Sequence, residues 1–130
     1  MFTLSVTDTF ITTALEAHLE CALWSSTDDD GVPLDANFTI FDFTPAARVR
    51  LEADLRDFAH AARTLLEGAV TVGDLTPSDI GHDLWLTRNG HGAGFFDRGL
   101  GNVGDALTGI AYALGTVDLY VTDSGRVDAA

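Results

Sequence analysis

The fold prediction depends most on residues 83–99, which read DLWLTRNGHGAGFFDRG. Leu84 and Leu86 alternate with Asp83, Trp85 and Thr87, which we interpret as the period of a strand. The Asn89-Gly90 pair that follows is a strong sequence signal for a two-residue type I′ turn between antiparallel strands. The segment therefore predicts a β-hairpin in which residues 91–98 form the return strand.

The predicted hairpin has two different faces. Leu84, Leu86 and Phe95 share one face, which is the natural core face of the sheet. The other face gathers aromatic residues beside two glycines, with Tyr120 contributed by a later strand: Trp85, Phe96, Tyr120, Gly92 and Gly94. Two interpretations of this second face stay open. It can form an aromatic platform that stacks a flat ring, or the preceding helices cover it and Trp85 fills the space over Gly94.

The chain before the predicted hairpin contains two helical patterns. Leucine and isoleucine recur every four residues and predict a helix over about residues 8–24. Thr44 suits the N-cap of a second helix and Pro45 its first helical position. Gly68 is a natural residue for the end of that helix.

The remaining segments complete the predicted order of elements. Residues 37–43 read as a short strand or an extended segment. Asn102 is a predicted cap for a third helix, which ends before Gly115, and residues 117–122 alternate as a last strand. The order helix, helix, strand, strand, helix, strand predicts a single α+β domain over residues 1–130, with a small and mainly antiparallel sheet.

The charge of the chain excludes some classes of partner. The sequence has 20 Asp and Glu residues against 7 basic residues, all of them arginine, and a net charge of −13. Such a chain has no general electrostatic attraction to nucleic acids or anionic membranes, so we expect it to bind neither directly. Hydrophobic residues make up 46% of the chain, which is enough for a core and argues against intrinsic disorder.

Cysteine content and hydropathy indicate the compartment. The single cysteine, Cys21, excludes an intramolecular disulfide and a cysteine-rich zinc site, and its place in the first predicted helix favours a small core residue. No apolar run approaches the roughly 18 residues of a membrane span, and no basic segment leads into an apolar one. We therefore expect a soluble, cytoplasmic protein without a cofactor.

Glycines alternate at the predicted hairpin tip, at positions 90, 92 and 94. Such a segment can present backbone N–H groups to an anion, and arginine and histidine side chains surround it. It is not a P-loop, which needs a lysine. We predict a ligand site formed by Trp85, Arg88, Asn89, His91, Gly92, Gly94, Phe96, Arg98 and Tyr120. The alternative is a glycine-rich hairpin tip that binds nothing.

Other chemistries find less support in the sequence. Residues 26–31 resemble the start of a calcium loop, but Asn37 stands where a bidentate glutamate is needed. His82 and His91 fall at opposite ends of the predicted hairpin, too far apart to share a metal ion. No serine lies in a G-x-S-x-G setting, and no carboxylate pair is placed for acid–base chemistry. An enzyme is therefore the less favoured class.

Three segments resemble a known family. They are ALWSSTDDDG at residues 22–31, LTRNGHGAGFFDRG at residues 86–99, and VDLYV at residues 117–121, which is followed by Asp-Ser-Gly. The segments are similar to those of small acidic proteins encoded by tailed phages and prophages of actinobacteria. Phe96 departs from the family, where tryptophan is common. The resemblance implies a phage origin and a place in the host cytoplasm, but no particular reaction, because the family has no settled activity.

Two functions are consistent with these observations. The first is a non-enzymatic phage accessory protein for counter-defence or host modulation, which binds a small anionic or nucleotide-like ligand at the glycine-rich hairpin. The alternative is an acidic protein–protein inhibitor or DNA mimic that engages a host protein. The arginines interleaved with carboxylates in the second helix favour a solvated, ion-paired face over a mimic of DNA. A homo-oligomer also stays open.

Overall fold

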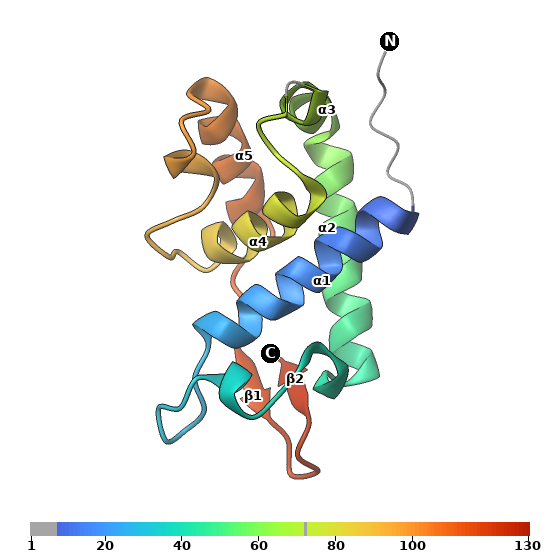
Figure 1. Ribbon diagram of the computed structural model, residues 1–130, viewed down its shortest axis with the longest axis vertical. Coiled ribbons are helices and arrows are strands. Elements are labelled where there is room, and N and C mark those ends of the chain that lie inside the picture. Colours follow the sequence, from blue (N-terminus) through green and yellow to red (C-terminus); the bar gives the residue numbers. More distant parts are fainter. Residues whose placement is uncertain (1–7, 72) are drawn as a thin grey trace.

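The computed structural model describes residues 8–71 and 73–130, which form five α-helices and one two-stranded sheet (Figure 1). The helices are α1 (Asp8–Ser25), α2 (Pro45–Ala61), α3 (Arg63–Thr71), α4 (Pro77–Arg88) and α5 (Asn102–Ala113). The strands are β1 (Leu119–Val121) and β2 (Val127–Ala129), and the short 3-10 helices are η1 (Leu34–Ala36), η2 (Ile40–Asp42) and η3 (Phe95–Asp97). The α+β class is confirmed, but the predicted order of elements is not.

The predicted β-hairpin is wrong, because residues 83–88 are helical and form the second half of α4. Thr76 determines where this helix begins. Its hydroxyl accepts a hydrogen bond from the Asp79 N–H at 3.2 Å, and the Asp79 carboxylate accepts one from the Thr76 N–H at 3.0 Å. Pro77 occupies the first helical position. Within residues 91–98, the regular structure is the short helix η3.

The second half of α4 reads as a strand because it is covered on all sides. Each residue from Asp83 to Arg88 is at most 5% exposed. A helix that is buried all round has no polar stripe, so the helical period that identifies an amphipathic helix is missing. Asn89 and Gly90 then end the helix instead of turning a hairpin. Gly90 has a φ of +72°, the left-handed conformation that commonly follows a helix.

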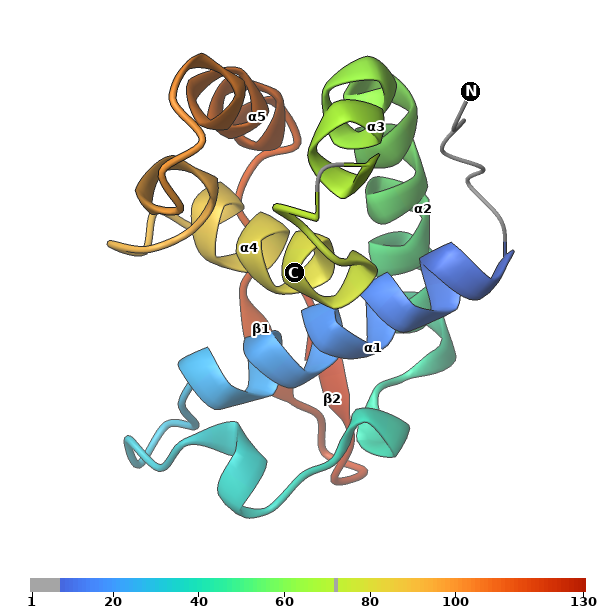
Figure 2. The same cartoon turned by 45° about the horizontal axis from the view of Figure 1, so that its top comes forward.

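Helix α1 lies across α2 and α4 and buries its predicted apolar stripe against them (Figures 1 and 2). The approach to α4 is close enough to require a glycine. A Cβ atom on Gly81 would lie 1.8 Å from the carbonyl oxygen of Ala14. The Nδ1 atom of His18 on α1 lies 2.8 Å from the carbonyl oxygen of Gly81, which joins the two helices at the same point. This helix pair forms the centre of the core.

Helix α2 begins as predicted but ends early. The Thr44 hydroxyl accepts a hydrogen bond from the Ala47 N–H at 3.1 Å, and Pro45 is the first helical residue. The predicted end at Gly68 is wrong, since α2 ends at Ala61 and Gly68 lies inside α3. The break between the two helices lets α3 change direction and bury Leu66, which is fully covered.

Helix α5 occupies the position of the third predicted helix. Asn102 is its first helical residue and not its cap, because Gly101 takes the N-cap position with a φ of +60°. Gly115, with a φ of +79°, follows its C-terminal end. None of the described helices is long and apolar enough to cross a membrane.

The sheet is smaller than predicted. Strand β1 falls within the predicted strand over residues 117–122, but its antiparallel partner is β2 and not a hairpin upstream. Val127 of β2 also forms a bridge with Phe43, and its carbonyl accepts a hydrogen bond from the Thr44 N–H at 2.9 Å. The sheet is thereby attached to the start of α2. Residues 37–43, for which a short strand or extended segment was expected, contain η2 and this bridge.

Candidate functional site

Arg88, a predicted anion ligand, is buried and forms hydrogen bonds within the protein through its Nε and Nη2 atoms, while its buried Nη1 atom has no partner among the described residues. Its side chain has no exposed surface, and its Nη2 atom donates to Asp54 Oδ2 at 2.9 Å. Its Nε and Nη2 atoms donate to the carbonyl oxygens of Gly115 and Leu114, at 2.9 and 3.4 Å. These carbonyls lie at the C-terminal end of α5, where a cation interacts favourably with the helix dipole. Arg88 therefore joins α2, α4 and α5 and is not available to a ligand.

Trp85 and Asn89 also form internal hydrogen bonds. The Trp85 side chain is 2% exposed, its Nε1 atom donates to Ser25 Oγ at 2.8 Å, and its ring meets His18 edge-on with centroids 5.4 Å apart. Asn89 donates to the Trp85 carbonyl at 3.1 Å and accepts from the Val117 N–H at 2.8 Å. The covered ring cannot serve as a stacking platform. The alternative interpretation, in which the preceding helices cover a hairpin face and Trp85 fills the space over Gly94, is not confirmed as stated, because Trp85 lies in a helix and contacts Ser25 and His18 of α1.

Two carboxylates of α4 hold Arg98. Its Nε atom donates to Asp83 Oδ2, and its Nη2 atom donates to Asp83 Oδ1 at 3.1 Å and to Asp79 Oδ1 at 3.3 Å. The hydrogen bond to Asp83 raises the pKa of Arg98 above its already high value. Asp83 is 2% exposed, so the arginine neutralises a buried carboxylate. The positive charge of Arg98, like that of Arg88, therefore pairs with carboxylates of the protein itself.

The backbone of the glycine-rich segment has partners of its own. The N–H groups of Gly90 and His91 donate to the carbonyls of the last turn of α4, at 3.1 and 3.0 Å. The Gly94 N–H donates to Asp97 Oδ1 at 3.0 Å. Gly94 has a φ of +141°, and a Cβ atom on it would lie 2.1 Å from Thr87 Oγ1. The predicted cradle of N–H groups is therefore committed to local hydrogen bonds, while Gly92 is exposed with open space around it.

The predicted aromatic face is not formed. Trp85 lies in α4, Phe96 in η3 and Tyr120 in β1, because the strands that would align them are absent from residues 83–98. Phe96 and Tyr120 are 45% and 47% exposed. The Tyr120 hydroxyl donates to Asp128 Oδ2 across the sheet at 3.0 Å.

Three of the predicted residues nevertheless share a pocket. Trp85, Asn89 and His91 line a hollow of about 400 Å³ together with residues 25–27 and 116–119. His91 is exposed there, and the Ser25 hydroxyl donates to the Cys21 carbonyl at 2.7 Å while accepting from Trp85. The pocket is small and polar.

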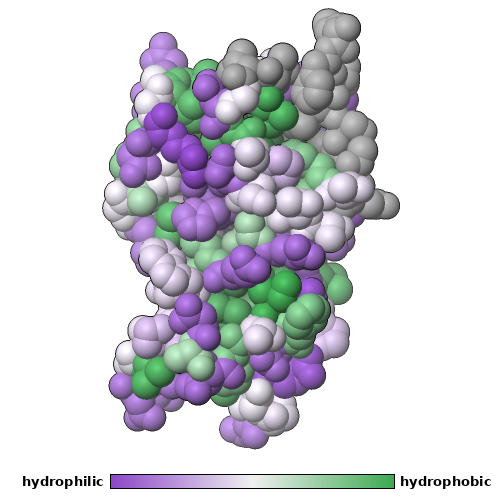
Figure 3. Space-filling model, viewed as in Figure 1, coloured by the Kyte–Doolittle hydropathy of each residue, from purple (hydrophilic) through white to green (hydrophobic). Residues whose placement is uncertain are grey.

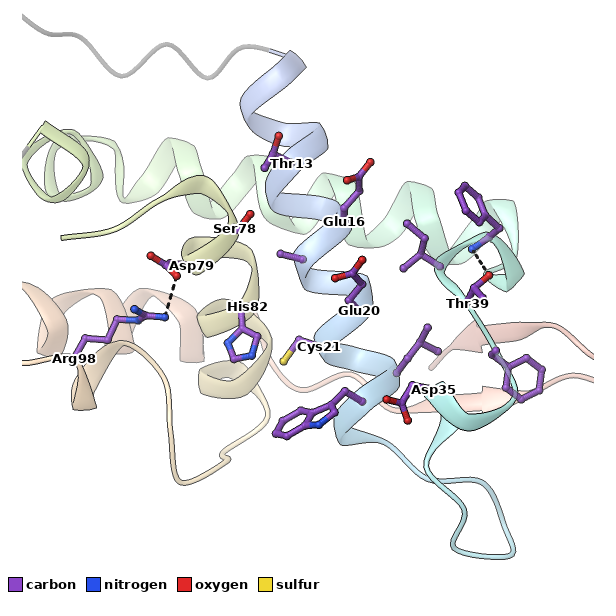
Figure 4. A pocket seen from close by; sticks show the side chains of 16 residues that line it. Thr13, Glu16, Glu20, Cys21, Asp35, Thr39, Ser78, Asp79, His82 and Arg98 are labelled. Atoms are coloured by element: carbon purple, nitrogen blue, oxygen red, sulfur yellow. Dashed lines mark hydrogen bonds and ion pairs between the residues drawn. The ribbon is translucent and has the colours of Figure 1, made fainter. Parts of the chain in front are cut away.

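A second hollow, of about 890 Å³, runs along α1 and was not predicted (Figure 4). We call it the α1 groove. Helix α1 divides its lining: Glu16, Glu20 and Asp35 lie toward η1 and η2, while Asp79, His82 and Arg98 lie toward α4. Apolar side chains complete the lining: Phe38, Ile40 and Phe41 belong to the segment around η2, and the ring of Trp24 lies 6.4 Å from that of His82. Figure 3 shows hydrophobic surface lying directly beside hydrophilic surface where α1 passes η2.

The α1 groove combines exposed aromatic rings with free carboxylates. Trp24 is 61% exposed and Phe41 79% exposed, although both are large hydrophobic residues. Among the described residues, no arginine or histidine forms an ion pair with Glu16, Glu20 or Asp35. An apolar wall and unneutralised negative charge therefore face the same hollow.

On the flank toward α4, Asp79, His82 and Arg98 have partners within the protein. The His82 side chain is 45% exposed, its ring lies 6.4 Å from that of Trp24, and its Nδ1 atom is 3.4 Å from Asp83 Oδ1. Burial raises the pKa of the Cys21 thiol to about 12, which keeps it protonated and supports its expected role as a core residue. Within residues 8–71 and 73–130, no group of three or more His, Cys, Asp or Glu side chains is arranged to hold a metal ion.

The sequence did contain a signal for the α1 groove. Glu16, Glu20 and Trp24 are four residues apart, so they form one row on a helix face beside the predicted apolar stripe, about 100° around the helix from it. A tryptophan in an otherwise polar row of a helix is a reason to expect a contact surface. The neighbouring segment is rich in aromatic residues, and its approach to this row depends on the tertiary fold.

Comparison of the chain with models of known protein families, with curated proteins and with solved structures found no match. The interpretation of the α1 groove therefore rests on its own residues.

Proposed function

We propose that the chain is a non-enzymatic accessory protein that binds a basic surface of a host protein through the α1 groove. The observation that carries this proposal is the coincidence of exposed aromatic rings and unpaired carboxylates in one groove. It favours the protein-binding alternative over the small anionic ligand, since the arginines intended for that ligand pair instead with Asp54, which is partly buried, and Asp83, which is buried.

The aromatic residues supply binding energy. Covering a large apolar side chain that is exposed in the free protein contributes about 1.5–3 kcal/mol. Trp24 and Phe41 leave most of their surface uncovered and are of the residue types that dominate protein interfaces. A partner with apolar side chains of its own can cover both rings at once.

The carboxylates determine which kind of partner can bind. The groove presents Glu16, Glu20 and Asp35 within a chain of net charge −13, so a cationic surface is attracted and an anionic one repelled. The same sign disfavours nucleic acid and a second copy of the chain. A basic patch on another protein fits both the charge and the apolar wall.

The resemblance to actinobacterial phage proteins supports a setting for this activity. A phage protein that covers a basic patch can block the nucleic-acid or protein partner which that patch normally binds, and counter-defence or modulation of a host enzyme would follow. The proposal needs no reaction chemistry at the groove.

Affinity capture from an actinobacterial host lysate tests the proposal when it is run with two variants. Trp24→Ala combined with Phe41→Ala removes both exposed rings of the groove. Tyr112→Ala removes a ring that is 56% exposed on α5, outside the groove, and serves as the matched control. We expect a host protein that the wild type and the control retain, that the groove variant loses, and that dissociates more readily at higher salt.

Equal retention by the groove variant would place the binding surface elsewhere and refute the proposal. So would a set of captured proteins that all three chains share without quantitative difference. Circular dichroism of each variant establishes that the fold is intact.

A second candidate function uses the pocket beside Trp85. Three predicted ligand residues border it, so a small nucleotide-like molecule is the alternative occupant. The chain has two tryptophans, and Trp24→Phe leaves Trp85 as the sole indole reporter. Titration of this variant with cyclic dinucleotides, cyclic ADP-ribose and NAD should change Trp85 emission if the pocket binds them. Flat titrations, together with flat calorimetry on the wild type, would eliminate this candidate.

A further inference from the structure

We propose that the occupant of the α1 groove is an amphipathic cationic helix of the partner protein. This inference rests on the proposed function and specifies the structure and sequence pattern of what binds. It follows from three properties of the groove: the spacing of its carboxylates, the position of its aromatic side chains, and the kind of backbone that can lie in it.

The carboxylates and one aromatic ring form a single row along α1. Glu16, Glu20 and Trp24 are each one helical turn apart, which spaces their Cα atoms by about 6 Å and makes the row about 12 Å long. A second helix lying alongside α1 repeats its own side chains at the same interval. Two basic residues four positions apart would therefore meet the two glutamates, and an apolar residue one turn further on would meet Trp24.

The wall of the α1 groove that faces Glu16 and Glu20 is apolar. Phe38, Ile40 and Phe41 line the groove, and Thr39 of the same segment lies across from Glu16 and Glu20 in Figure 4. A helix between the two walls needs basic residues on the side that faces α1 and apolar residues on the side that faces η2. That division is the pattern of an amphipathic helix, and Asp35 near the Trp24 end offers a third negative charge.

The backbone argument favours a helix over an extended peptide. Strand addition requires an open sheet edge that supplies N–H and C=O groups. The α1 groove is walled by the side chains of α1, η2 and α4, and the described sheet lies at β1 and β2. An extended peptide in the groove would find few backbone partners, whereas a helix satisfies its own hydrogen bonds before it binds.

A synthetic peptide can serve as the probe. It is a 14-residue alanine-based helix with arginine at two positions four apart and leucine one turn beyond on the adjoining face. A second peptide of the same composition distributes its arginines around the helix. Binding to the full chain is measured from Trp24 emission in a Trp85→Phe variant and by calorimetry on the wild type. We expect the patterned peptide to bind at least about tenfold more tightly than the scrambled one.

Variants of the chain establish where the peptide lies. Glu16→Gln combined with Glu20→Gln should weaken binding of the patterned peptide about tenfold. Asp105→Asn combined with Asp123→Asn makes the same change in net charge at exposed sites outside the groove and should leave binding unchanged. Equal weakening by both pairs would mean that only the overall charge matters and would overturn the proposal.

Other outcomes of these experiments would also overturn the proposal. Equal affinity for the two peptides, or no binding of either, would overturn the helical occupant. In that case a host protein that is lost on substitution of Trp24 and Phe41 would still support the proposed function, so the two failures are distinguishable. Self-association of the chain through the groove, detected by sedimentation and abolished by the same substitutions, would identify a second copy as the occupant and overturn the proposal.

Discussion

Charged residues have opposite roles around α4 and on the outer face of α1. Around α4, Arg88 and Arg98 each meet a carboxylate that the fold has partly or wholly removed from water, so their charges stabilise the structure. On the outer face of α1, Glu16 and Glu20 have no such cation among the described residues. A charged residue points to binding only when the fold leaves it unpaired. The arginines attract attention in an acidic sequence, but the available charge is that of the glutamates.

The largest effect on stability should come from Arg88. Replacing it with methionine leaves Asp54 and the C-terminal carbonyls of α5 without their cation, and loss of one partner of a buried pair costs about 3–5 kcal/mol. Urea unfolding of Arg88→Met measures this loss. Arg50→Met, at an exposed position of α2, should change the free energy of unfolding by less than about 0.5 kcal/mol. A similar small loss for Arg88→Met would remove the contrast between α4 and the outer face of α1.

The contact that holds α1 against α4 can be tested at Gly81. Alanine at this position places a Cβ atom against the Ala14 backbone and should destabilise the protein by about 3 kcal/mol. Gly109 is the matched control, because it also lies in a helix but has no neighbour within 4 Å of a Cβ atom. Gly109→Ala should stabilise the protein by up to about 1 kcal/mol. Opposite signs for the two alanines in thermal unfolding would confirm the close approach, and equal signs would contradict it.

The same helix contact should weaken in acid because of His18. Burial lowers the pKa of this histidine to about 4, so the unfolded chain binds a proton below about pH 6.5 that the folded chain refuses. Its contribution is complete above that pH and is lost as the pH falls toward 4. The loss from about pH 7.5 to about pH 5 is about 2 kcal/mol.

Unfolding of wild type and His18→Asn across this range isolates the effect, since asparagine can still hydrogen-bond to the Gly81 carbonyl but does not titrate. The difference between their free energies of unfolding should change with pH in the stated direction. Parallel curves would show that His18 takes no part in the acid sensitivity.

The smallest effect should come from the α1 face itself. Glu16 and Glu20 are like charges one turn apart, so Glu20→Gln should stabilise the isolated protein by about 0.3 kcal/mol. The same substitution should weaken binding of a cationic partner. A variant that is slightly more stable but binds less well is the signature of a functional surface. A clear loss of stability would instead assign Glu20 a structural role and contradict the comparison of α4 with the outer face of α1.

Local patterns predicted some elements correctly and misread one. The apolar stripe of α1 and the Thr44-Pro45 start of α2 are properties of neighbouring residues, and both were confirmed. Helix α4 was misread because burial on every side removes its amphipathic period, and because Asn89-Gly90 is as good an end for a helix as it is a turn for a hairpin. The split between α2 and α3 falls at Ala62, where neither a glycine nor a proline marks it, so no local pattern reveals it.

The predicted site residues, too, come together only where they are close to one another in the chain. Trp85, Asn89 and His91 do border one pocket, because they are near one another in the chain at the end of α4. Phe96 and Tyr120 were assigned to that face through a strand register that does not exist. The row from Glu16 to Trp24 could be read from helical spacing, but its exposure could not.

The sequence by itself determined the α+β class, the acidity, the start of α2 and the position of strand β1, since each depends on composition or on residues close together in the chain. Only the tertiary structure decided which charges remain free. Arg88 meets Asp54, 34 positions away, and Arg98 meets Asp83, 15 positions away. Pairing between distant residues depends on how the helices pack, and this packing turned the conspicuous arginines into structural supports and left the α1 groove open with its own negative charge.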